Sequence, residues 1–253
     1  MADTSDAAVQ KCWVVLPTYC EADNLGVIID RLGQTGLALN ILIVDDNSPD
    51  GTGDIAAALA ADHSNIHLLR RLSKSGLGSA YLAGFAHAID AGADVVITMD
   101  SDLSHEPKVL PQMLDKLSDA GCVVGSRYIP GGSIVNWPFR RRVLSAAANH
   151  FVRLLFQIPV KDCTSGYRVY RRSVIDDILR IGPRSQGYSF QVEALRIAVS
   201  GRLPVVESPI CFVERVAGKS KMGIREVVHG GARLCTLRLG SLNIGPKPDN
   251  TNE

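Results

Sequence analysis

The 253-residue sequence lacks the marks of membrane-spanning, secreted and nucleic-acid-binding chains. No apolar stretch approaches the roughly 18 to 20 residues that a membrane helix needs. The N-terminus, MADTSDAAVQK, is small and polar, without the apolar segment of a signal peptide. The formal net charge is only +1, which gives no general attraction to nucleic acid. We therefore expect a cytoplasmic chain that neither spans a membrane nor binds nucleic acid.

Cysteine pairing and the usual glycine fingerprints are also absent. The six cysteines are scattered without CxxC spacing, which argues against a zinc site or a disulfide framework and for reduced thiols. The glycine loop KSGLGSA, at residues 74–80, lacks the Walker spacing and resembles GxGxxG only weakly. An ordinary loop is favoured there over a phosphate cradle. These absences disfavour P-loop NTPases and dinucleotide oxidoreductases.

What the sequence does contain is a regular alternation of apolar runs and amphipathic segments in its first half. A composition of 46% hydrophobic and 21% charged residues suits a globular protein with a sizeable core. Predicted helices separate the apolar runs, which lie at residues 12–19, 40–46, 66–72, 94–100 and 122–128. This pattern predicts an α/β fold, a mostly parallel sheet with helices on both faces.

The second half is less regular. A loop is predicted at residues 131–138. An amphipathic helix is predicted at residues 139–157, with an apolar face that includes Val143, Ala147, Phe151 and Leu155. Further helices are expected at residues 173–181, 189–201 and 225–239, and an extended segment at residues 203–216. Without any repeat or linker, we expect a single domain over residues 11–240, between a disordered N-terminus at residues 1–10 and a disordered tail at residues 241–253.

The sequence MDSDLSHEP places two carboxylates, Asp100 and Asp102, at the end of a predicted strand. Ligands of parallel sheets bind beyond the carboxyl ends of the strands. Residues i and i+2 of an extended strand share a face, so both carboxylates can point at one cation. Oxygen ligands suit Mg²⁺ or Mn²⁺, which commonly bridge substrate phosphates. The alternative is a solvated strand end with acidic turn residues.

A second acidic segment and a set of basic residues accompany this pair. Asp46, in VDDNSPDGTGD, can accept hydrogen bonds from a ribose or a base, although the same stretch suits an ordinary turn and helix start capped by Ser48 or Asp50. Singly, each basic residue suits a solvated surface, but together they suggest two phosphorylated partners. The set comprises Arg127, Arg140, Arg141, Arg142, Arg168, Arg171, Arg172, Arg215, Lys219 and Lys221.

The motifs, taken in order, resemble glycosyltransferase family 2, and more narrowly the dolichol-phosphate or polyprenol-phosphate mannose synthases of the bacterial, actinobacterial type. They are LPTYCEADNL, VDDNSPDGTG, KSGLGSAYLAGF, MDSDLSHEP, GSRYIPGGSIVNWPFRRRVLS, DCTSGYRVYRR, GYSFQVE and ERVAGKSKMG. The resemblance covers nearly the whole chain. It implies a single-domain, Rossmann-like GT-A fold and inverting, metal-dependent transfer of mannose from GDP-mannose to a polyprenyl phosphate.

The resemblance also implies roles for individual residues. Residues matched to the donor site are Pro17, Tyr19, Glu21, Val44, Asp46, Asp100, Ser101, Arg215 and Lys221, the last two on a loop that closes on the donor phosphates. Residues matched to the metal are Asp100, Asp102 and Ser104, where Ser104 replaces a Gln of some relatives. Residues matched to catalysis are Asp102, Arg127 and Arg141, the two arginines near the sugar and the acceptor phosphate.

Two departures from the family pattern and a membrane question remain. Cys20 stands where the family usually has Asn, and the chain stops without the membrane helices that some relatives append. The predicted helix at residues 139–157 either meets the membrane peripherally, at its cytoplasmic face, or packs into the core as an ordinary amphipathic helix. A separate membrane-anchoring protein is a further alternative. Alternative functions are a family 2 transferase that uses UDP-glucose, and a non-catalytic nucleotide-sugar-binding protein.

Overall fold

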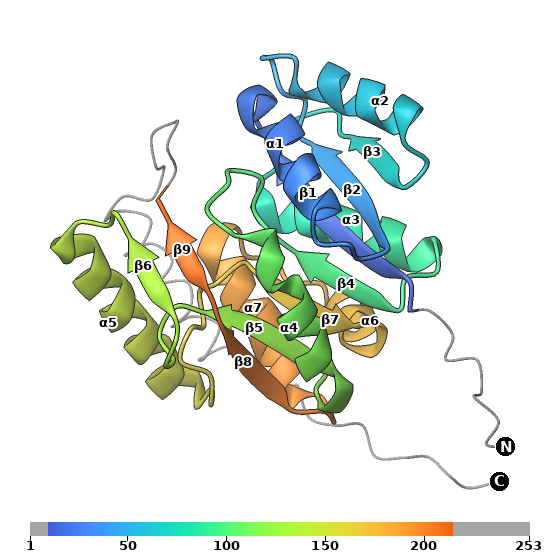
Figure 1. Ribbon diagram of the computed structural model, residues 1–253. Coiled ribbons are helices and arrows are strands. Elements are labelled where there is room, and N and C mark those ends of the chain that lie inside the picture. The colour runs from blue at the N-terminus through green and yellow to red at the C-terminus, as the bar shows by residue number, and fades with distance from the viewer. Residues whose placement is uncertain (1–9, 215–253) are drawn as a thin grey trace, which may run out of the picture.

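A computed structural model describes residues 10–214, which form one seven-stranded sheet with helices on both faces (Figure 1). The strand order is β3-β2-β1-β4-β7-β5-β8, and every neighbouring pair is parallel except those that include β7. The strands are β1 (Cys12–Thr18), β2 (Leu39–Asp45), β3 (Ile66–Arg70), β4 (Val95–Thr98), β5 (Cys122–Ser126), β7 (Arg168–Arg171) and β8 (Val205–Pro209). The predicted α/β fold with a mostly parallel sheet is confirmed.

Two hydrophobic clusters, one on each face of the sheet, hold the helices in place. Successive side chains of a strand point to opposite faces, so Val14 and Leu16 enter one cluster while Trp13 and Val15 enter the other. The first cluster packs beneath α1 (Ala22–Gly33), α2 (Thr52–Asp62) and α4 (Leu110–Lys116), the last flanked by the 3₁₀ turns Pro107–Val109 and Leu117–Asp119. The second packs beneath α3 (Leu77–Asp90), α6 (Arg172–Ile181) and α7 (Gly187–Ser200).

Strand β7 is an element that the sequence analysis did not predict. It lies between β4 and β5 and runs antiparallel to both, with Ile97 opposite Val169 and Val123 opposite the same residue. Its sequence, RVYR, is short and begins and ends with arginine, so it lacks the apolar run of the other strands. Because it runs backwards, its amino end lies at the edge where β4 and β5 end. The preceding segment, residues 162–167, therefore lies at that edge too.

A second, smaller unit extends the domain on one flank. The strands β6 (Ser133–Val135) and β9 (Cys211–Val213) pair in parallel, and α5 (Phe139–Phe156) lies beside them, at the left of Figure 1. The prediction of a loop at residues 131–138 was therefore wrong at β6, whose pairing partner is distant in the sequence. The extended segment predicted at residues 203–216 is confirmed as β8 and β9 up to residue 213. The predicted helix at residues 225–239 and both predicted disordered ends, apart from Gln10, lie outside the described residues.

Candidate active site

The polar segments that follow the strands meet at one edge of the sheet. In the pairing of β1 with its neighbours, Thr18 lies opposite Asp45 and Val15 opposite Thr98, so β1, β2 and β4 end close together. Strand β5 runs in the same direction as β4 and ends at Ser126. This edge is where open α/β sheets bind ligands. The segments that carry the predicted site residues therefore end close together, and the location of the site at this edge stays a prediction.

Asp100 and Asp102 lie at this edge, but not in the strand that was predicted to carry them. Strand β4 ends at Thr98, and both aspartates follow in a bend. The alternation of side chains along a strand therefore does not decide where the two carboxylates point. The bend is held by the Ser101 hydroxyl, which donates to the Pro17 carbonyl oxygen at 3.1 Å, and by Asp102 Oδ1, which accepts the backbone N–H of Ser104 at 3.0 Å. Local hydrogen bonds thus replace pleating as the cause of the geometry.

His105 supports the same bend, a role that was not predicted from the sequence. Its buried ring stacks on Tyr167 with centroids 5.0 Å apart, and its Nδ1 accepts the backbone N–H of Asp100 at 3.3 Å. Burial lowers the pKa of His105 to about 4, with Arg127 also lowering it and Asp102 opposing the shift. A neutral imidazole can accept this hydrogen bond, whereas an imidazolium cannot.

The donor atoms at this bend fit a divalent cation that binds together with a substrate. Asp100 and Asp102 supply carboxylate oxygens, and within residues 10–214 no group of three or more His, Cys, Asp or Glu side chains forms a separate cage. Mg²⁺ typically binds through one or two carboxylates and takes its other ligands from water and substrate phosphates. The Ser104 hydroxyl donates to Asp102 Oδ1 at 2.5 Å, so it orients that carboxylate. A direct contact of Ser104 with the metal stays a prediction.

Asp46 lies at the end of β2 and is paired with a residue that the sequence analysis missed. Its Oδ1 accepts from Arg71 at 2.6 Å, and its Oδ2 accepts the backbone N–H of Ser75 at 3.3 Å. The same guanidinium donates to Ser79 at 2.5 Å. A carboxylate has about four lone-pair sites, so Asp46 keeps capacity for a ribose hydroxyl. Val44, also matched to the donor site, is fully buried in the core, and its place at the donor stays a prediction.

The remaining donor-site candidates of β1 lie in the turn that follows it. The ammonium group of Lys74 lies 3.5 Å from the centre of the Tyr19 ring, which joins the glycine loop to the end of β1. The backbone N–H of Glu21 donates to Thr52 Oγ1 at 3.0 Å. Between them, Cys20 has a φ of +60°, in the left-handed region. The turn therefore brings Tyr19 and Glu21 to the edge that also holds Asp46.

The glycine loop at residues 74–80 is shaped by a contact within the protein. Gly76 has a φ of +90°, and a Cβ there would lie 2.4 Å from Oε1 of Gln186. The same Oε1 accepts the backbone N–H of Gly78 at 3.1 Å. Only glycine fits this position. Because the Gly78 amide already has a partner, the structure favours the ordinary loop over the phosphate cradle.

Arg127 follows β5 and is held by a buried carboxylate. Its Nε donates to Asp162 Oδ2 at 2.7 Å, and its Nη2 donates to Asp162 Oδ1, also at 2.7 Å. Nη2 donates to Thr164 Oγ1 as well, at 3.0 Å. Burial alone would lower the pKa of the Arg127 guanidinium, but the Asp162 carboxylate outweighs burial and raises that pKa. The planar fork of the guanidinium is thus fixed in one orientation. Neither Asp162 nor Thr164 was predicted as a site residue.

Arg141, in the first turn of α5, lies beside a buried tryptophan that Arg127 also approaches. Its guanidinium stacks 4.1 Å from the centre of the Trp137 ring and forms an ion pair with Glu214. The Arg127 guanidinium lies 5.5 Å from the same ring. Trp137 in turn packs edge to face on Phe212, with centroids 5.3 Å apart. The structure therefore brings the two predicted acceptor-side arginines together around one aromatic residue.

Other members of the predicted basic set do not join the site. Arg168 is fully buried and donates to the backbone oxygens of Gln191 at 2.7 Å and Cys163 at 3.0 Å, so its role is structural. Arg171 and Arg172 lie at the opposite edge of the sheet because β7 runs backwards. The grouping of these three arginines with the phosphate site was wrong. Arg215, Lys219 and Lys221 lie outside the described residues.

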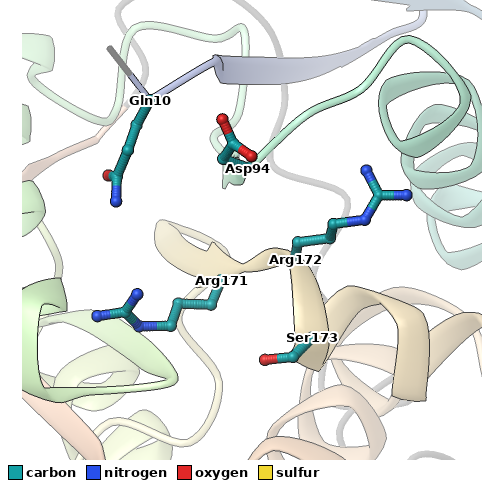
Figure 2. Close-up of a pocket in the computed structure, with 5 residues that line it drawn as sticks. All are labelled: Gln10, Asp94, Arg171, Arg172 and Ser173. Atoms are coloured by element: carbon teal, nitrogen blue, oxygen red, sulfur yellow. The ribbon is translucent and has the colours of Figure 1, made fainter. Parts of the chain in front are cut away.

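The opposite edge carries a polar depression of about 380 Å³, shown in Figure 2. Its two arginines point to opposite sides in that view, and both donate to backbone carbonyl oxygens, Arg171 to Ala120 at 2.8 Å and Arg172 to Ala93 at 3.1 Å. They therefore tie loops together instead of facing a ligand. The depression is lined by Gln10, Asp94, Arg171, Arg172 and Ser173.

Comparison with known sequences identifies the family. Residues 13–179 match the family described as Glycosyl transferase family 2. The Polyprenol monophosphomannose synthase of Mycolicibacterium smegmatis is 46% identical over 225 residues, which cover 87% of this chain and 84% of that protein. The Undecaprenyl-phosphate mannosyltransferase of Micrococcus luteus is 43% identical over 209 residues, covering 82% of this chain and 86% of that protein.

Comparison with solved structures identifies the fold. Glucosyl-3-phosphoglycerate synthase from Mycobacterium tuberculosis, in complex with Mn²⁺, uridine diphosphate and glucosyl-3-phosphoglycerate, gives a TM-score of 0.64 at 18% identity, covering 95% of this chain and 82% of that chain. The mannosyltransferase PcManGT from Pyrobaculum calidifontis, in complex with GDP-Man and Mn²⁺, gives 0.57 at 18% identity, covering 90% and 70%. The fold is therefore the GT-A fold that the resemblance implied. The chain belongs to glycosyltransferase family 2 and is a glycosyltransferase.

Proposed function

We propose that this enzyme transfers mannose from GDP-mannose to a polyprenyl phosphate, with inversion at the anomeric carbon and release of GDP. The observation that carries the proposal is the 46% identity, over 87% of the chain, to a protein named Polyprenol monophosphomannose synthase. The Undecaprenyl-phosphate mannosyltransferase, at 43% identity, supports the same class of donor sugar and acceptor.

The residues of the carboxyl edge would serve the donor. Asp46 and the turn with Tyr19 and Glu21 would hold the guanosine. Asp100 and Asp102 would hold Mg²⁺ or Mn²⁺, which when bound neutralises the diphosphate and improves GDP as a leaving group. The Mn²⁺ in the two solved neighbours supports a divalent cation in this fold. The protein would prepare this metal site in advance, because the Ser104 hydroxyl already orients the Asp102 carboxylate.

The acceptor supplies its own nucleophile. A phosphate oxygen of the polyprenyl phosphate is anionic at neutral pH, so it attacks the anomeric carbon without a strong general base. The new bond forms from that oxygen to the carbon, while the bond to the β-phosphate oxygen of GDP breaks and GDP keeps the electron pair. Arg127 and Arg141 would orient the attacking anion and offset its repulsion by the donor diphosphate. Arg215 and Lys221 would close on the donor.

Helix α5 is the part of the chain that we propose meets the lipid. Phe139 is 79% exposed and Leu154 69%, and Val143, Leu144 and Phe151 are also exposed. The buried residues of α5 are Asn149 and Val152, which disfavours the alternative of an ordinary core-packed helix. Arg140 and Arg142 are exposed on the same helix, where they can meet anionic head groups. No helix among residues 10–214 has the length and apolarity to cross a bilayer.

Peripheral association with a membrane surface follows from this reading of α5, and we propose the cytoplasmic face as the place of that contact. A separate membrane-anchoring protein is the alternative, and it would take up the same exposed apolar side chains. Binding of the isolated enzyme to protein-free lipid vesicles separates the two. Vesicle binding supports direct contact, and its absence, with activity restored by a membrane fraction, supports a partner.

One assay tests the function itself. Radiolabelled sugar is supplied from GDP-mannose, UDP-glucose or UDP-GlcNAc to polyprenyl phosphate, with and without EDTA. We expect transfer from GDP-mannose, abolished by EDTA and restored by Mg²⁺ or Mn²⁺. Preferred transfer from UDP-glucose would favour the alternative family 2 activity. A failure of all three donors in a folded, nucleotide-binding preparation would favour a non-catalytic protein. The presence of the full set in the sequence weighs against that alternative: Asp100, Asp102, Arg127, Arg141 and Arg215.

A further inference from the structure

Asn149 is a fully hydrogen-bonded amide on a helix that is otherwise mostly exposed. The residue is buried, with 3% of its surface exposed. Its Oδ1 accepts the backbone N–H of Cys163 at 2.8 Å and of Thr164 at 3.2 Å. Its Nδ2 donates to the Ser145 carbonyl oxygen at 2.9 Å and to Thr164 Oγ1 at 3.3 Å. One side chain therefore joins α5 to the segment that precedes β7.

That segment is the one that fixes Arg127. Asp162 holds the guanidinium through both carboxylate oxygens, and Thr164 Oγ1 accepts from Arg127 as well as from Asn149. Two further residues along, the Gly166 carbonyl oxygen accepts from the Thr98 hydroxyl at 2.7 Å, at the end of β4. A Cβ on Gly166 would lie 3.7 Å from Asp100 Oδ1. The segment thus touches both the arginine and the metal-binding bend.

The opposite side of the segment is held by the sheet. Glu207 of β8 accepts the backbone N–H of Lys161 and of Asp162, each at 3.0 Å. This attachment fixes one end of the segment to the rigid core. The middle of the segment, at Cys163 and Thr164, is held by Asn149 of α5 through its two backbone N–H groups. Displacement of α5 would therefore act on Thr164, whose hydroxyl accepts from Arg127, while Asp162 keeps its own two contacts with the guanidinium.

Helical spacing places the predicted acceptor arginine on the same stripe of α5 as Asn149. Arg141, Ser145 and Asn149 are four residues apart, so they lie on one face of the helix. The Ser145 hydroxyl accepts from Tyr128 at 2.7 Å, which follows Arg127 directly. The way this face of α5 packs on the domain therefore influences where Arg127 and Arg141 lie relative to the bend that carries Asp100.

We propose that Asn149 is a positioning residue that couples the seating of α5 to the orientation of Arg127. The inference rests on the proposed function, because Arg127 matters here as an acceptor-side cation. Through Asn149, α5 presents the lipid-facing side chains on one side and holds the Arg127 segment on the other. An enzyme whose α5 is correctly seated then has its arginines aligned for the acceptor phosphate.

The test compares two substitutions of Asn149. Asn149→Leu has a similar size and makes no hydrogen bonds. Asn149→Asp can still accept the backbone N–H groups of Cys163 and Thr164, but it no longer donates to Ser145 and Thr164. His150→Ala, an exposed change at the next residue, is the matched control. Each preparation is titrated with GDP and Mn²⁺, and transfer to detergent-solubilised polyprenyl phosphate is expressed per GDP-binding site. Amide hydrogen exchange is measured at Cys163 and Thr164.

For Asn149→Leu we expect faster exchange at both amides, unchanged GDP affinity, a higher KM for the acceptor and a loss of transfer per site of at least about tenfold, since small misplacements cost about 10²-fold. Asn149→Asp should fall between Asn149→Leu and wild type, and it keeps the test possible if Asn149→Leu does not fold. His150→Ala should match wild type. The proposal is overturned if exchange does not change, or if it rises while transfer per site and acceptor KM stay at wild-type values.

The same experiment separates a failure of this inference from a failure of the proposed function. If wild-type enzyme uses a different nucleotide sugar, the comparison is repeated with that donor and the expected ratios are unchanged. If wild-type enzyme transfers nothing to polyprenyl phosphate, the proposed function fails, and with it the role of Asn149 in transfer. Faster exchange in Asn149→Leu would still establish the contact between α5 and the Arg127 segment.

Discussion

Asp102 is the residue whose surroundings match most directly the chemistry proposed for it. Its carboxylate is oriented by Ser104 and lies in a bend outside the core strands. Asp102→Ala removes the carboxylate that we propose binds the metal and alters no strand of the sheet, so we expect a folded protein that has lost metal-dependent GDP binding. Calorimetry with GDP, in the presence and absence of Mn²⁺, measures this loss.

The control for this change is Asp115→Ala, which removes an exposed aspartate on α4. It should keep the wild-type dependence of GDP affinity on Mn²⁺. A folded Asp102→Ala protein with wild-type metal dependence would refute the assignment of this carboxylate.

Cys20 has a backbone conformation that suits the Asn that the family resemblance implies at this position. Its φ of +60° is in the left-handed region, where a residue other than Gly, Asn or Asp costs roughly 1–2 kcal/mol. Its side chain is exposed, so a substitution disturbs no packing. Cys20→Asn should therefore raise the free energy of unfolding by several tenths of a kcal/mol or more, read from urea denaturation. A lower stability for Cys20→Asn would mean that the thiol makes a favourable contact.

Arg141 tests the division between donor-side and acceptor-side arginines. Its guanidinium stacks on Trp137 and pairs with Glu214. Loss of a charge-assisted contact to the acceptor costs roughly 1.5–3 kcal/mol, and each 1.36 kcal/mol is about tenfold in rate. Arg141→Ala should therefore slow transfer at least about tenfold while GDP-mannose affinity stays nearly intact.

Two further variants sharpen the result for Arg141. Arg141→Lys should recover only part of the rate, because lysine keeps the charge but loses the planar fork that stacks on Trp137. Arg180→Ala, which removes an exposed arginine on α6, should leave both quantities unchanged. If donor affinity in Arg141→Ala falls as much as the transfer rate, Arg141 belongs to the donor site.

At the scale of elements, α5 differs from the other helices in what it exposes. Burial of a leucine side chain is worth about 1.5–3 kcal/mol, so removal of one that enters the lipid should weaken vesicle binding about tenfold or more. Leu154→Ser should show this loss on anionic vesicles and keep wild-type activity on detergent-solubilised acceptor. Leu203→Ser, at an exposed leucine outside α5, should bind vesicles like wild type. Equal binding by the two variants would remove α5 from the membrane contact.

The elements that were predictable from the sequence are those whose pattern is set locally. Strands β1, β2, β4 and β5 are apolar runs because both of their faces are covered, and such runs are visible without a structure. Strand β7 was missed because its stability comes from two antiparallel neighbours and from Arg168, a buried cation that satisfies distant carbonyl groups. The pairing of β6 with β9 was missed for the same reason.

The residues of the candidate site also divide into those that were predictable from the local sequence and those that were not. The pair Asp100 and Asp102, and the strand-end position of Asp46, were predictable because the carboxyl edge of a parallel sheet collects them. Asp162, Trp137 and Asn149 were not, because each acts through a partner that is distant in the sequence. A buried Asp that pairs with an arginine and an Asp on the surface have the same local sequence signal. Only the fold tells them apart.

At the scale of the whole molecule, ligand binding and folding are linked. A ligand that binds only the folded state adds about 2.7 kcal/mol of stability when its concentration is about a hundred times Kd. For a domain of this size each kcal/mol shifts the unfolding midpoint by about 2–4 °C. GDP with Mn²⁺ should therefore raise the midpoint of thermal unfolding by several degrees, and EDTA should remove most of that shift.

The same measurement ranks the donors without any transfer assay. The pyrophosphate and the metal are common to GDP and UDP, so a difference in their shifts reports on the base alone. The relatives at 43–46% identity are named for mannose transfer, which motivates the expectation that GDP raises the midpoint more than UDP at equal concentration with Mn²⁺. In Asp102→Ala the shifts by both nucleotides should shrink together, because the metal contribution is shared. Equal shifts by GDP and UDP in the wild-type enzyme would count against GDP-mannose as the preferred donor, while leaving the family, the fold and the carboxylate site as they are.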